Sequence, residues 1–206
     1  MNSIFFRPAV YLPLKLMKVK GAIHIGAHEA EELDHYVSCG VKKIIWVEAL
    51  PEKQKILEKK LANYAEMYIG NFAAGEKNCN LDFNIASNGM SSSLLEFDSH
   101  TSEHPEIKML SSVNVEMKRM DDYIDEINVS RKDFNFLLLD IQGYELNALK
   151  GMINQLIFVD YIWTEVSTQD LYVGGARLQK MDEFLSSHGF TRVIKIMSKH
   201  GYGDAL

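Results

Sequence analysis

The chain has 206 residues, of which 47% are hydrophobic and 24% charged, the composition of a globular domain with a sizeable core. Its net charge of −6 and its lack of a basic cluster argue against nucleic acid as a partner. No apolar run approaches the roughly 20 residues of a membrane-spanning helix. The two cysteines, Cys39 and Cys79, suit reduced thiols better than a disulfide framework, so we expect a cytoplasmic protein.

Residues 1–20 are apolar and slightly basic, a composition that a targeting signal can share. Two prolines and two lysines interrupt the apolar run, and no cleavage site of small residues follows it. We therefore expect an N-terminal arm at 1–20 and a single domain at 21–206. The arm would pack over this domain or over a second copy of the chain in a homo-oligomer.

The most informative segment predicts a strand, a turn, a helix and a second strand. An apolar run at 22–25 stops at Gly26, a helix-favouring segment covers 29–37, and a second buried strand at 43–47 ends on Glu48. A glycine turn followed by an acid about 20 residues later is typical of the nucleotide-binding half of a doubly wound sheet. The glycine lets a ligand approach the backbone, and the helix N-terminus offers N–H groups to an anion. Glu48 is placed to accept hydrogen bonds from two ribose hydroxyls.

The turn also indicates which nucleotide it suits. A dinucleotide site normally carries G-x-G-x-x-G, whereas residues 26–31 read Gly-Ala-His-Glu-Ala-Glu. A pyrophosphate beside Glu29 and Glu31 would be repelled by their charge. S-adenosylmethionine, which carries a cationic sulfonium and no phosphate, suits the turn better. A purely structural unit without a ligand is the alternative at this point.

The rest of the chain continues the alternation of strands and helices. Helices are predicted from helical spacing at 52–61, at 120–127, in the segment that ends at Lys150, and at 178–187. Strands are predicted at 67–69, 81–85, 113–117, 134–139, 161–164 and 192–197. This pattern predicts an α/β protein with a central, mostly parallel sheet of about seven strands and helices on both faces.

Polar and small residues follow several of these strands. Asp140 and Glu165 each come directly after a predicted strand, as Glu48 does, and residues 71–75 follow the strand that ends at Ile69. Ligands in open α/β sheets bind at the carboxyl ends of the strands. We therefore expect the three acids to share one edge, with residues 71–75 as a wall of the adenosine site.

The chain resembles the FkbM family of S-adenosylmethionine-dependent methyltransferases. The resemblance rests on motifs in the family's order, at residues 23–28, 46–49, 139–145, 165–166, 170–172 and 201–205. It implies a Rossmann-like methyltransferase fold, S-adenosylmethionine as cofactor, and a small-molecule or glycan acceptor. Family members commonly methylate hydroxyls, often on sugars of glycans or natural products, so O-methylation of a sugar hydroxyl is the expected activity.

Candidate site residues follow from the motifs and the strand ends. Two acids, Asp140 and Glu165, are the catalytic candidates: Asp140 as general base, and Glu165 either to orient the acceptor or to share a cation with Asp140. Asp140 has two alternative roles, as a cap of the following helix or as a partner of the donor's amino group. The expected cofactor-binding residues are Gly26, Ala27, His28, Glu48, Ala49, Asn71, Ala73 and Asp140.

Two residues depart from the family's pattern. Gln142 stands where the family usually has an acid, so a second carboxylate next to Asp140 is missing and no metal is expected. His24 replaces a common aspartate of the first strand, which leaves open what binds the donor's amino group.

Two other functions are alternatives to methyl transfer. An NAD-dependent sugar-modifying oxidoreductase would want three glycines in the turn, and in the short-chain type a Tyr-x-x-x-Lys pair. The one such spacing, Tyr11 to Lys15, contains Pro13 and precedes the fold. A non-catalytic Rossmann-like subunit would bind the donor without turning it over.

Overall fold

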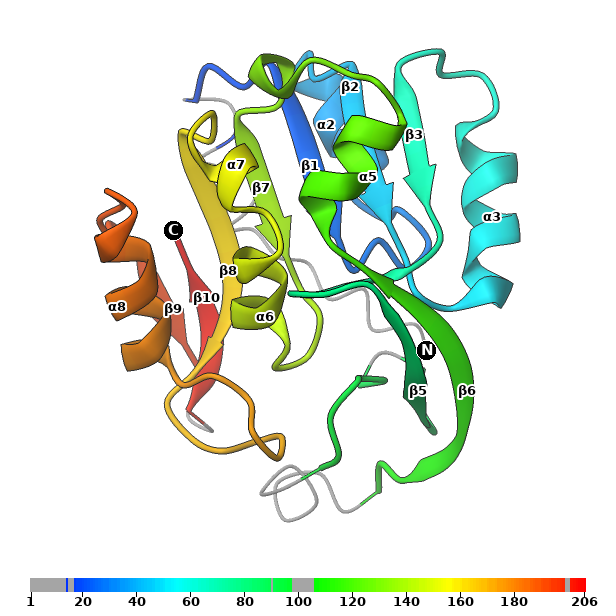
Figure 1. Ribbon diagram of the computed structural model, residues 1–206, viewed down its shortest axis with the longest axis vertical. Helices are drawn as coiled ribbons and strands as arrows, with labels where there is room; N and C mark the ends of the chain where they lie inside the picture. Colours follow the sequence, from blue (N-terminus) through cyan, green and yellow to red (C-terminus); the bar gives the residue numbers. More distant parts are fainter. Residues whose placement is uncertain (1–13, 15–16, 90, 98–105, 199–200) are drawn as a thin grey trace.

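A seven-stranded sheet forms the centre of the protein (Figure 1), with strand order β3-β2-β1-β7-β8-β10-β9. The computed structural model describes residue 14 and residues 17–89, 91–97, 106–198 and 201–206. The strands are β1 (Gly21–Ile25), β2 (Lys43–Val47), β3 (Met67–Gly70), β7 (Phe136–Leu139), β8 (Tyr161–Ser167), β9 (Lys195–Met197) and β10 (Tyr202–Ala205). Six of them run in the same direction, and only β10 among these strands is antiparallel to both of its neighbours. The predicted fold class, a mostly parallel seven-stranded sheet, is confirmed.

The strand order reverses between β1 and β7. From β1 the chain proceeds outward through β2 to β3, and it then returns to place β7 on the other side of β1. Every residue of β1 and β7 is buried, as their continuous apolar sequences require of strands covered on both faces. Such a reversal leaves a crevice at the carboxyl ends of the two strands, which is where doubly wound sheets bind ligands.

Helices cover both faces of this sheet (Figure 1). Alternate strand residues point to opposite faces, so Ile44 and Trp46 pack with α2 (Leu33–Ser38) and α3 (Pro51–Leu61). Ile45 and Val47 contribute to the other core. The helices on that side are α5 (Met120–Glu126), α6 (Glu145–Lys150), α7 (Ile153–Leu156) and α8 (Leu178–Ser187), with the 3-10 turn η1 (Arg131–Asp133) after α5.

A second, three-stranded sheet lies beside the carboxyl ends of the central strands (Figure 1). Its order is β4-β6-β5, in which β5 (Cys79–Ala86) and β6 (Met109–Lys118) form an antiparallel pair and β4 (Ala73–Ala74) runs parallel to β6. A small apolar cluster ties this sheet to the central body, because Ala73, Val115 and Met117 pack with Ala49 and Tyr144. The predicted strands at 81–85 and 113–117 are thus outside the central sheet.

Two local predictions differ from the structure. The first helix begins at Leu33 instead of residue 29, because His28 and Ala30 have left-handed backbone conformations, with φ of 44° and 52°. The carbonyls of Glu29 and Ala30 accept hydrogen bonds from Lys60 Nζ, which holds the irregular segment in place. The second difference is β10, a polar, glycine-containing strand with no predicted element, which supplies the seventh strand of the sheet.

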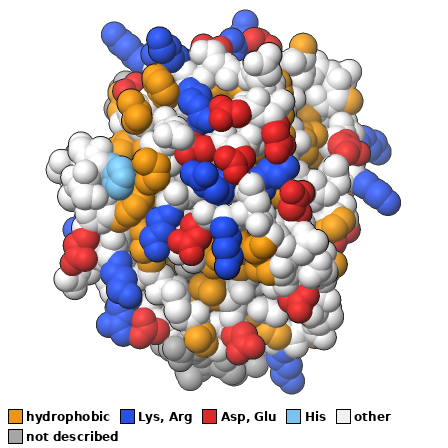
Figure 2. Space-filling model, in the orientation of Figure 1, with side chains coloured by type: hydrophobic (Ala, Val, Ile, Leu, Met, Phe, Trp, Pro, Cys, Tyr) orange, Lys and Arg blue, Asp and Glu red, His pale blue; other side chains and the backbone are white. Residues whose placement is uncertain are grey.

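The predicted N-terminal arm falls mostly outside the described residues, since only Leu14 and residues 17–20 of it are described. Leu14 is buried, and Met17 and Val19 pack against the same apolar cluster as α2. Within the described part of the chain, no helix is both long and apolar enough to cross a membrane. On the face seen in Figure 2, basic and acidic side chains are interleaved.

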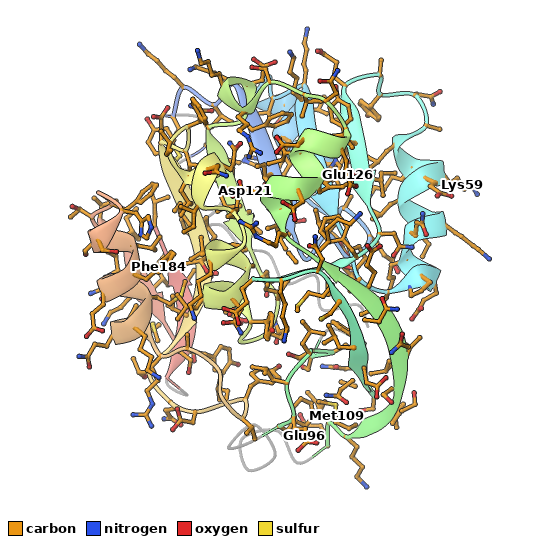
Figure 3. All side chains as sticks on the ribbon, viewed as in Figure 1. Lys59, Glu96, Met109, Asp121, Glu126 and Phe184 are labelled. Carbon is orange, nitrogen blue, oxygen red and sulfur yellow. The ribbon has the colours of Figure 1, made fainter. Side chains whose placement is uncertain are left out.

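A buried carboxylate joins the helices on one face of the sheet. Asp121 is 1% exposed and accepts hydrogen bonds from the backbone N–H groups of Asn154 and Gln155, both at 3.0 Å (Figure 3). Arg131 donates to Asp121 Oδ1 at 2.8 Å and to the exposed Asp125 at 2.5 Å. One arginine therefore has a buried partner and an exposed partner.

We predict that Asp121→Ala lowers the free energy of unfolding by about 3 kcal/mol or more, because it leaves buried donors and the Arg131 charge without their acceptor. The matched control Asp125→Ala removes the exposed partner of the same arginine and should cost less than about 1 kcal/mol. Urea unfolding followed by circular dichroism measures both. Equal losses in the two variants would contradict the role given to the buried acid.

Candidate active site

A cavity of about 530 Å³ opens at the carboxyl ends of the central strands, a volume within the usual range for small-molecule sites. Its walls come from the turn after β1, the ends of β2, β7 and β8, the segment around β4, and the loop that follows β5. Seven of the predicted site residues line it: Gly26, His28, Glu48, Ala49, Ala73, Asp140 and Glu165. The predicted convergence of these strand ends on one space is therefore present in the structure.

Gly26 lies close against the backbone of Asp140 in this crevice. Its φ is 88°, and a Cβ atom at this position would lie 1.9 Å from the carbonyl oxygen of Asp140. The N–H groups of Gly26 and Ala27 both donate to the carbonyl of Val47, at 3.0 and 2.9 Å. A side chain at position 26 is excluded both by the backbone conformation and by this contact. The turn thereby joins the ends of β1, β2 and β7.

Glu48 lies at the end of β2 with 8% of its surface exposed. Its Oε2 accepts a hydrogen bond from the N–H of His28 at 2.8 Å, and its Oε1 accepts one from the N–H of Leu50 at 2.9 Å. Burial raises the pKa of Glu48, while these backbone hydrogen bonds act in the opposite direction. A carboxylate has about four acceptor sites, so these bonds fix its orientation and leave capacity for a ligand hydroxyl.

The rim of the cavity carries an ion pair between His28 and Glu31, whose Nδ1 and Oε1 atoms are 2.6 Å apart. The hydrogen bond to Glu31 raises the pKa of His28 above its ordinary value. Burial alone would raise the pKa of Glu31, but the bonds from His28 and from backbone N–H groups outweigh it and lower this pKa to about 2.

Carboxylates dominate the charge of the cavity. The acids in its lining are Glu31, Glu32, Glu48, Asp140 and Glu165. Among the described residues that line it there is no lysine or arginine. This space favours a cationic ligand and disfavours a phosphate-bearing one.

Beyond Asp140, the side chain of Gln142 joins the two catalytic candidates. Its Nε2 donates to Asp140 Oδ1 at 2.8 Å and to Glu165 Oε2 at 3.0 Å. Its Oε1 accepts a hydrogen bond from the hydroxyl of Tyr172 at 2.8 Å. Tyr172 is 4% exposed, and burial together with the nearby carboxylates raises its pKa.

A second acid supports the turn that carries Gln142. Glu145 is fully buried at the start of α6, and its Oε1 accepts hydrogen bonds from the N–H groups of Ile141 at 3.0 Å and Gly143 at 3.2 Å. Burial raises its pKa to about 7, and the charge of Asp140 adds to this shift. The turn after β7 is thus held from inside by a group that titrates near neutral pH.

Most of the chain matches a known protein family. Residues 24–192 match the model described as the methyltransferase FkbM domain. The chain belongs to this family. It is also similar to the 2-O-methyltransferase NoeI of Sinorhizobium fredii, with 24% identity over 174 residues, which cover 80% of this chain and 70% of NoeI.

Solved methyltransferase structures share the fold of this FkbM protein. Fibrillarin of Aeropyrum pernix, solved with natively bound S-adenosyl-L-methionine, aligns with a TM-score of 0.54 and 9% identity, over 96% of this chain and 73% of that one. The ribosomal protein L11 methylase of Lactobacillus delbrueckii aligns with a TM-score of 0.51 and 11% identity, over 94% and 73% of the two chains. At these identities the likeness establishes the fold alone.

Two of the predicted donor residues do not line the cavity of the FkbM domain. Asn71 turns toward α3, where its amide donates to Gln54 Oε1. Ala27 is 1% exposed and is held through its backbone. The neighbouring Phe72, which lies within the predicted wall at 71–75, lines the cavity and packs against Tyr123 with ring centroids 4.8 Å apart. The sequence signal that could have identified Phe72 is its aromatic side chain directly before Ala73.

Tyr172 and the serine loop were not among the expected site residues, although Tyr172 lies in the family motif at 170–172. Ser91 and Ser92 are buried in the cavity wall, and the neighbouring Ser93 donates to the backbone carbonyl of Gln142 at 2.8 Å. This loop follows the predicted strand at 81–85, and its residue 90 lies outside the described residues. Only the three-dimensional fold brings this loop to the turn after β7.

The raised pKa of Glu145 predicts a pH-dependent stability. Between its ordinary value of 4.5 and about 7, the folded protein keeps a proton that the unfolded chain has released. The stability of the wild-type protein should therefore fall as pH rises through this window, relative to Glu145→Gln, whose amide oxygen can still accept both backbone bonds. Melting temperatures of both proteins at pH 5, 6, 7 and 8 measure the gap.

The gap between Glu145→Gln and wild type should widen up to about pH 7 and then stay constant. Glu183→Gln, which neutralises an exposed acid on α8, is the control and should give no comparable trend. A gap that is the same at pH 5 and pH 8 would refute the raised pKa.

Proposed function

We propose that the protein is an S-adenosylmethionine-dependent O-methyltransferase that acts on a hydroxyl of a sugar or glycan. The observation that carries this proposal is the cavity itself, in which Gly26, Glu48 and Asp140 lie at the ends of three adjacent strands. Membership of the methyltransferase FkbM family supports the reaction class.

The donor would occupy the part of the cavity next to β1 and β2. Glu48 would accept hydrogen bonds from the two ribose hydroxyls, since its backbone bonds hold the carboxylate at the end of β2. Ala49, Phe72 and Ala73 offer an apolar wall for the adenine. The acidic lining favours the sulfonium of S-adenosylmethionine and opposes the pyrophosphate of NAD. Both arguments select the same donor.

The methyl group would be transferred near Asp140 and Glu165. An acceptor hydroxyl oxygen attacks the methyl carbon as the carbon–sulfur bond breaks, and S-adenosylhomocysteine leaves. The hydroxyl proton passes to a base, for which Asp140 is the candidate, while Glu165 would orient the acceptor. Alignment of oxygen, carbon and sulfur in one line supplies much of the acceleration.

Transfer to oxygen is supported by the relative NoeI, a 2-O-methyltransferase, and a carbohydrate acceptor is supported by the chemistry of the site. Sugar hydroxyls need a base to become nucleophiles, and the cavity lining supplies two carboxylates on adjacent strands, β7 and β8. Tyr144 and Tyr172 also line the cavity and offer faces for stacking against a sugar ring.

We predict that Glu48→Ala weakens binding of S-adenosylhomocysteine at least tenfold, because hydrogen bonds from the ribose to a charged acceptor are lost. Isothermal titration calorimetry with S-adenosylhomocysteine measures this effect, and NAD serves as the parallel ligand. Glu52→Ala, an exposed acid on α3, is the matched control and should bind like wild type. Unchanged affinity in the Glu48 variant would refute the proposed donor site. Tight binding of NAD would favour the oxidoreductase.

We predict that Asp140→Asn slows methyl transfer about 100-fold or more while affinity for S-adenosylhomocysteine stays within about threefold, because the amide cannot accept the proton. Transfer is followed as S-adenosylhomocysteine release with a panel of neutral oligosaccharides. Asp34→Asn, an exposed substitution on α2, should keep wild-type rates. Donor binding without methylation of any panel member would favour the non-catalytic subunit.

A further inference from the structure

One amide holds both carboxylates of the proposed reaction centre. The two N–H bonds of Gln142 Nε2 point to Asp140 Oδ1 at 2.8 Å and to Glu165 Oε2 at 3.0 Å. Two carboxylate oxygens bonded to one nitrogen atom are close neighbours and repel each other when both are ionised. Either a cation or a shared pair of hydrogen-bond donors can offset this repulsion, and here the amide supplies the donors.

The orientation of this amide is determined by its surroundings. Its nitrogen faces two acceptors, and its oxygen accepts a hydrogen bond from the hydroxyl of the buried Tyr172 at 2.8 Å. A flipped amide would place Oε1 against two carboxylates, so the network admits one orientation. The backbone carbonyl of Gln142 is held as well, by the hydroxyl of Ser93 at 2.8 Å. The donors are therefore fixed in place before any ligand binds.

The backbone at this position gives an independent indication. Gln142 has φ of 54°, a left-handed conformation that favours glycine, and the next residue is Gly143 with φ of 96°. A long side chain persists in this turn although glycine would suit the backbone better. Strain at one residue, combined with three satisfied hydrogen bonds of its side chain, is typical of a residue kept for its position in a functional site.

The residues around the amide lack one acid for a metal centre. Within the described part of the chain, no group of three or more histidine, cysteine, aspartate or glutamate side chains could hold a metal ion. Asp140 and Glu165 supply two carboxylates, and hard divalent cations are bound by several oxygen ligands. A glutamate in place of Gln142 would supply a third carboxylate at the point where the amide nitrogen now lies.

We propose that Gln142 is a positioning residue whose amide occupies the place of a divalent cation between Asp140 and Glu165. It holds both carboxylates at the edge of the cavity by hydrogen bonds, so the site needs no metal. This inference builds on the proposed function, because Asp140 and Glu165 are the acids assigned to the transfer.

The test uses the full chain with Mn²⁺ as the probe, and free Mn²⁺ is quantified by electron paramagnetic resonance. Gln142→Glu replaces the donors by a carboxylate of the same shape, and Gln142→Met removes the donors at similar volume. Gln179→Glu is the matched control, because Gln179 also donates to a carboxylate, Glu183, but lies exposed on α8. Circular dichroism of every variant verifies the fold.

Gln142→Glu should bind one Mn²⁺ at least tenfold more tightly than wild type, and a further Asp140→Asn substitution should abolish this gain. Mn²⁺ should also raise the melting temperature of Gln142→Glu by roughly 3 °C or more, whereas Gln142→Met and Gln179→Glu should not respond. If Gln142 only filled space, Mn²⁺ would not stabilise Gln142→Glu. Equal Mn²⁺ affinity in wild type and Gln142→Glu, whether tight or undetectable, would overturn the proposal.

The same samples separate this inference from the proposed function. Calorimetry with S-adenosylhomocysteine reports on the donor site at β1 and β2 and requires no metal. Loss of donor binding in wild type would refute the proposed function while leaving the Mn²⁺ result interpretable. Tight wild-type Mn²⁺ binding that Asp140→Asn removes would refute the role of Gln142 while leaving the donor site intact.

Discussion

The contact between Gly26 and the backbone of Asp140 is the constraint on which the site depends. The strand order reverses between β1 and β7, and the first residue after β1 lies directly against the first residue after β7. A Cβ atom at position 26 would lie 1.9 Å from the Asp140 carbonyl, so only glycine allows this approach. The turn after β1 and the proposed base are therefore positioned by a single backbone contact. Hydrogen bonds from the turn to Val47 add β2, and with it Glu48, to the same unit.

The parts of the fold that could be predicted are those with strong local signals. Buried parallel strands have continuous apolar sequences, so β1, β2 and β7 were recognisable, and α3 and α8 follow helical spacing. The strand β10 has no such signal, because Tyr-Gly-Asp-Ala is stabilised by backbone pairing with β8 and β9. The late start of α2 was equally unpredictable from the sequence. It results from left-handed conformations at His28 and Ala30, and neither residue type indicates such a conformation.

The site residues also divide into those with a local sequence signal and those without one. The positions of Glu48 and Asp140 follow from the rule that parallel strands collect their carboxyl ends at one edge. Glu165 lies within β8, which continues to Ser167, directly after the part of β8 that pairs with β7. Contacts between segments distant in sequence do not follow from any local rule. Tyr172 and Ser93 reach Gln142 from 30 and 49 residues away along the chain. Asn71 follows the expected strand, but its side chain donates a hydrogen bond to Gln54 on α3 and does not line the cavity. The next residue, Phe72, lines the cavity. Side-chain direction at a strand end is set by such competing partners.

The hydrogen bonds around Gln142 also connect the second sheet to the proposed reaction centre. Ser93 pairs with Asn84 of β5 through its backbone and with Gln142 through its hydroxyl, so the loop after β5 is fixed at both ends. Tyr172 donates to the amide of Gln142 and packs against Phe97, with ring centroids 5.7 Å apart. Ser93 and Tyr172 therefore join two segments distant in sequence to the amide that holds Asp140 and Glu165. A change at either residue would remove a hydrogen-bond partner of Gln142 and would act on both carboxylates through the same few hydrogen bonds.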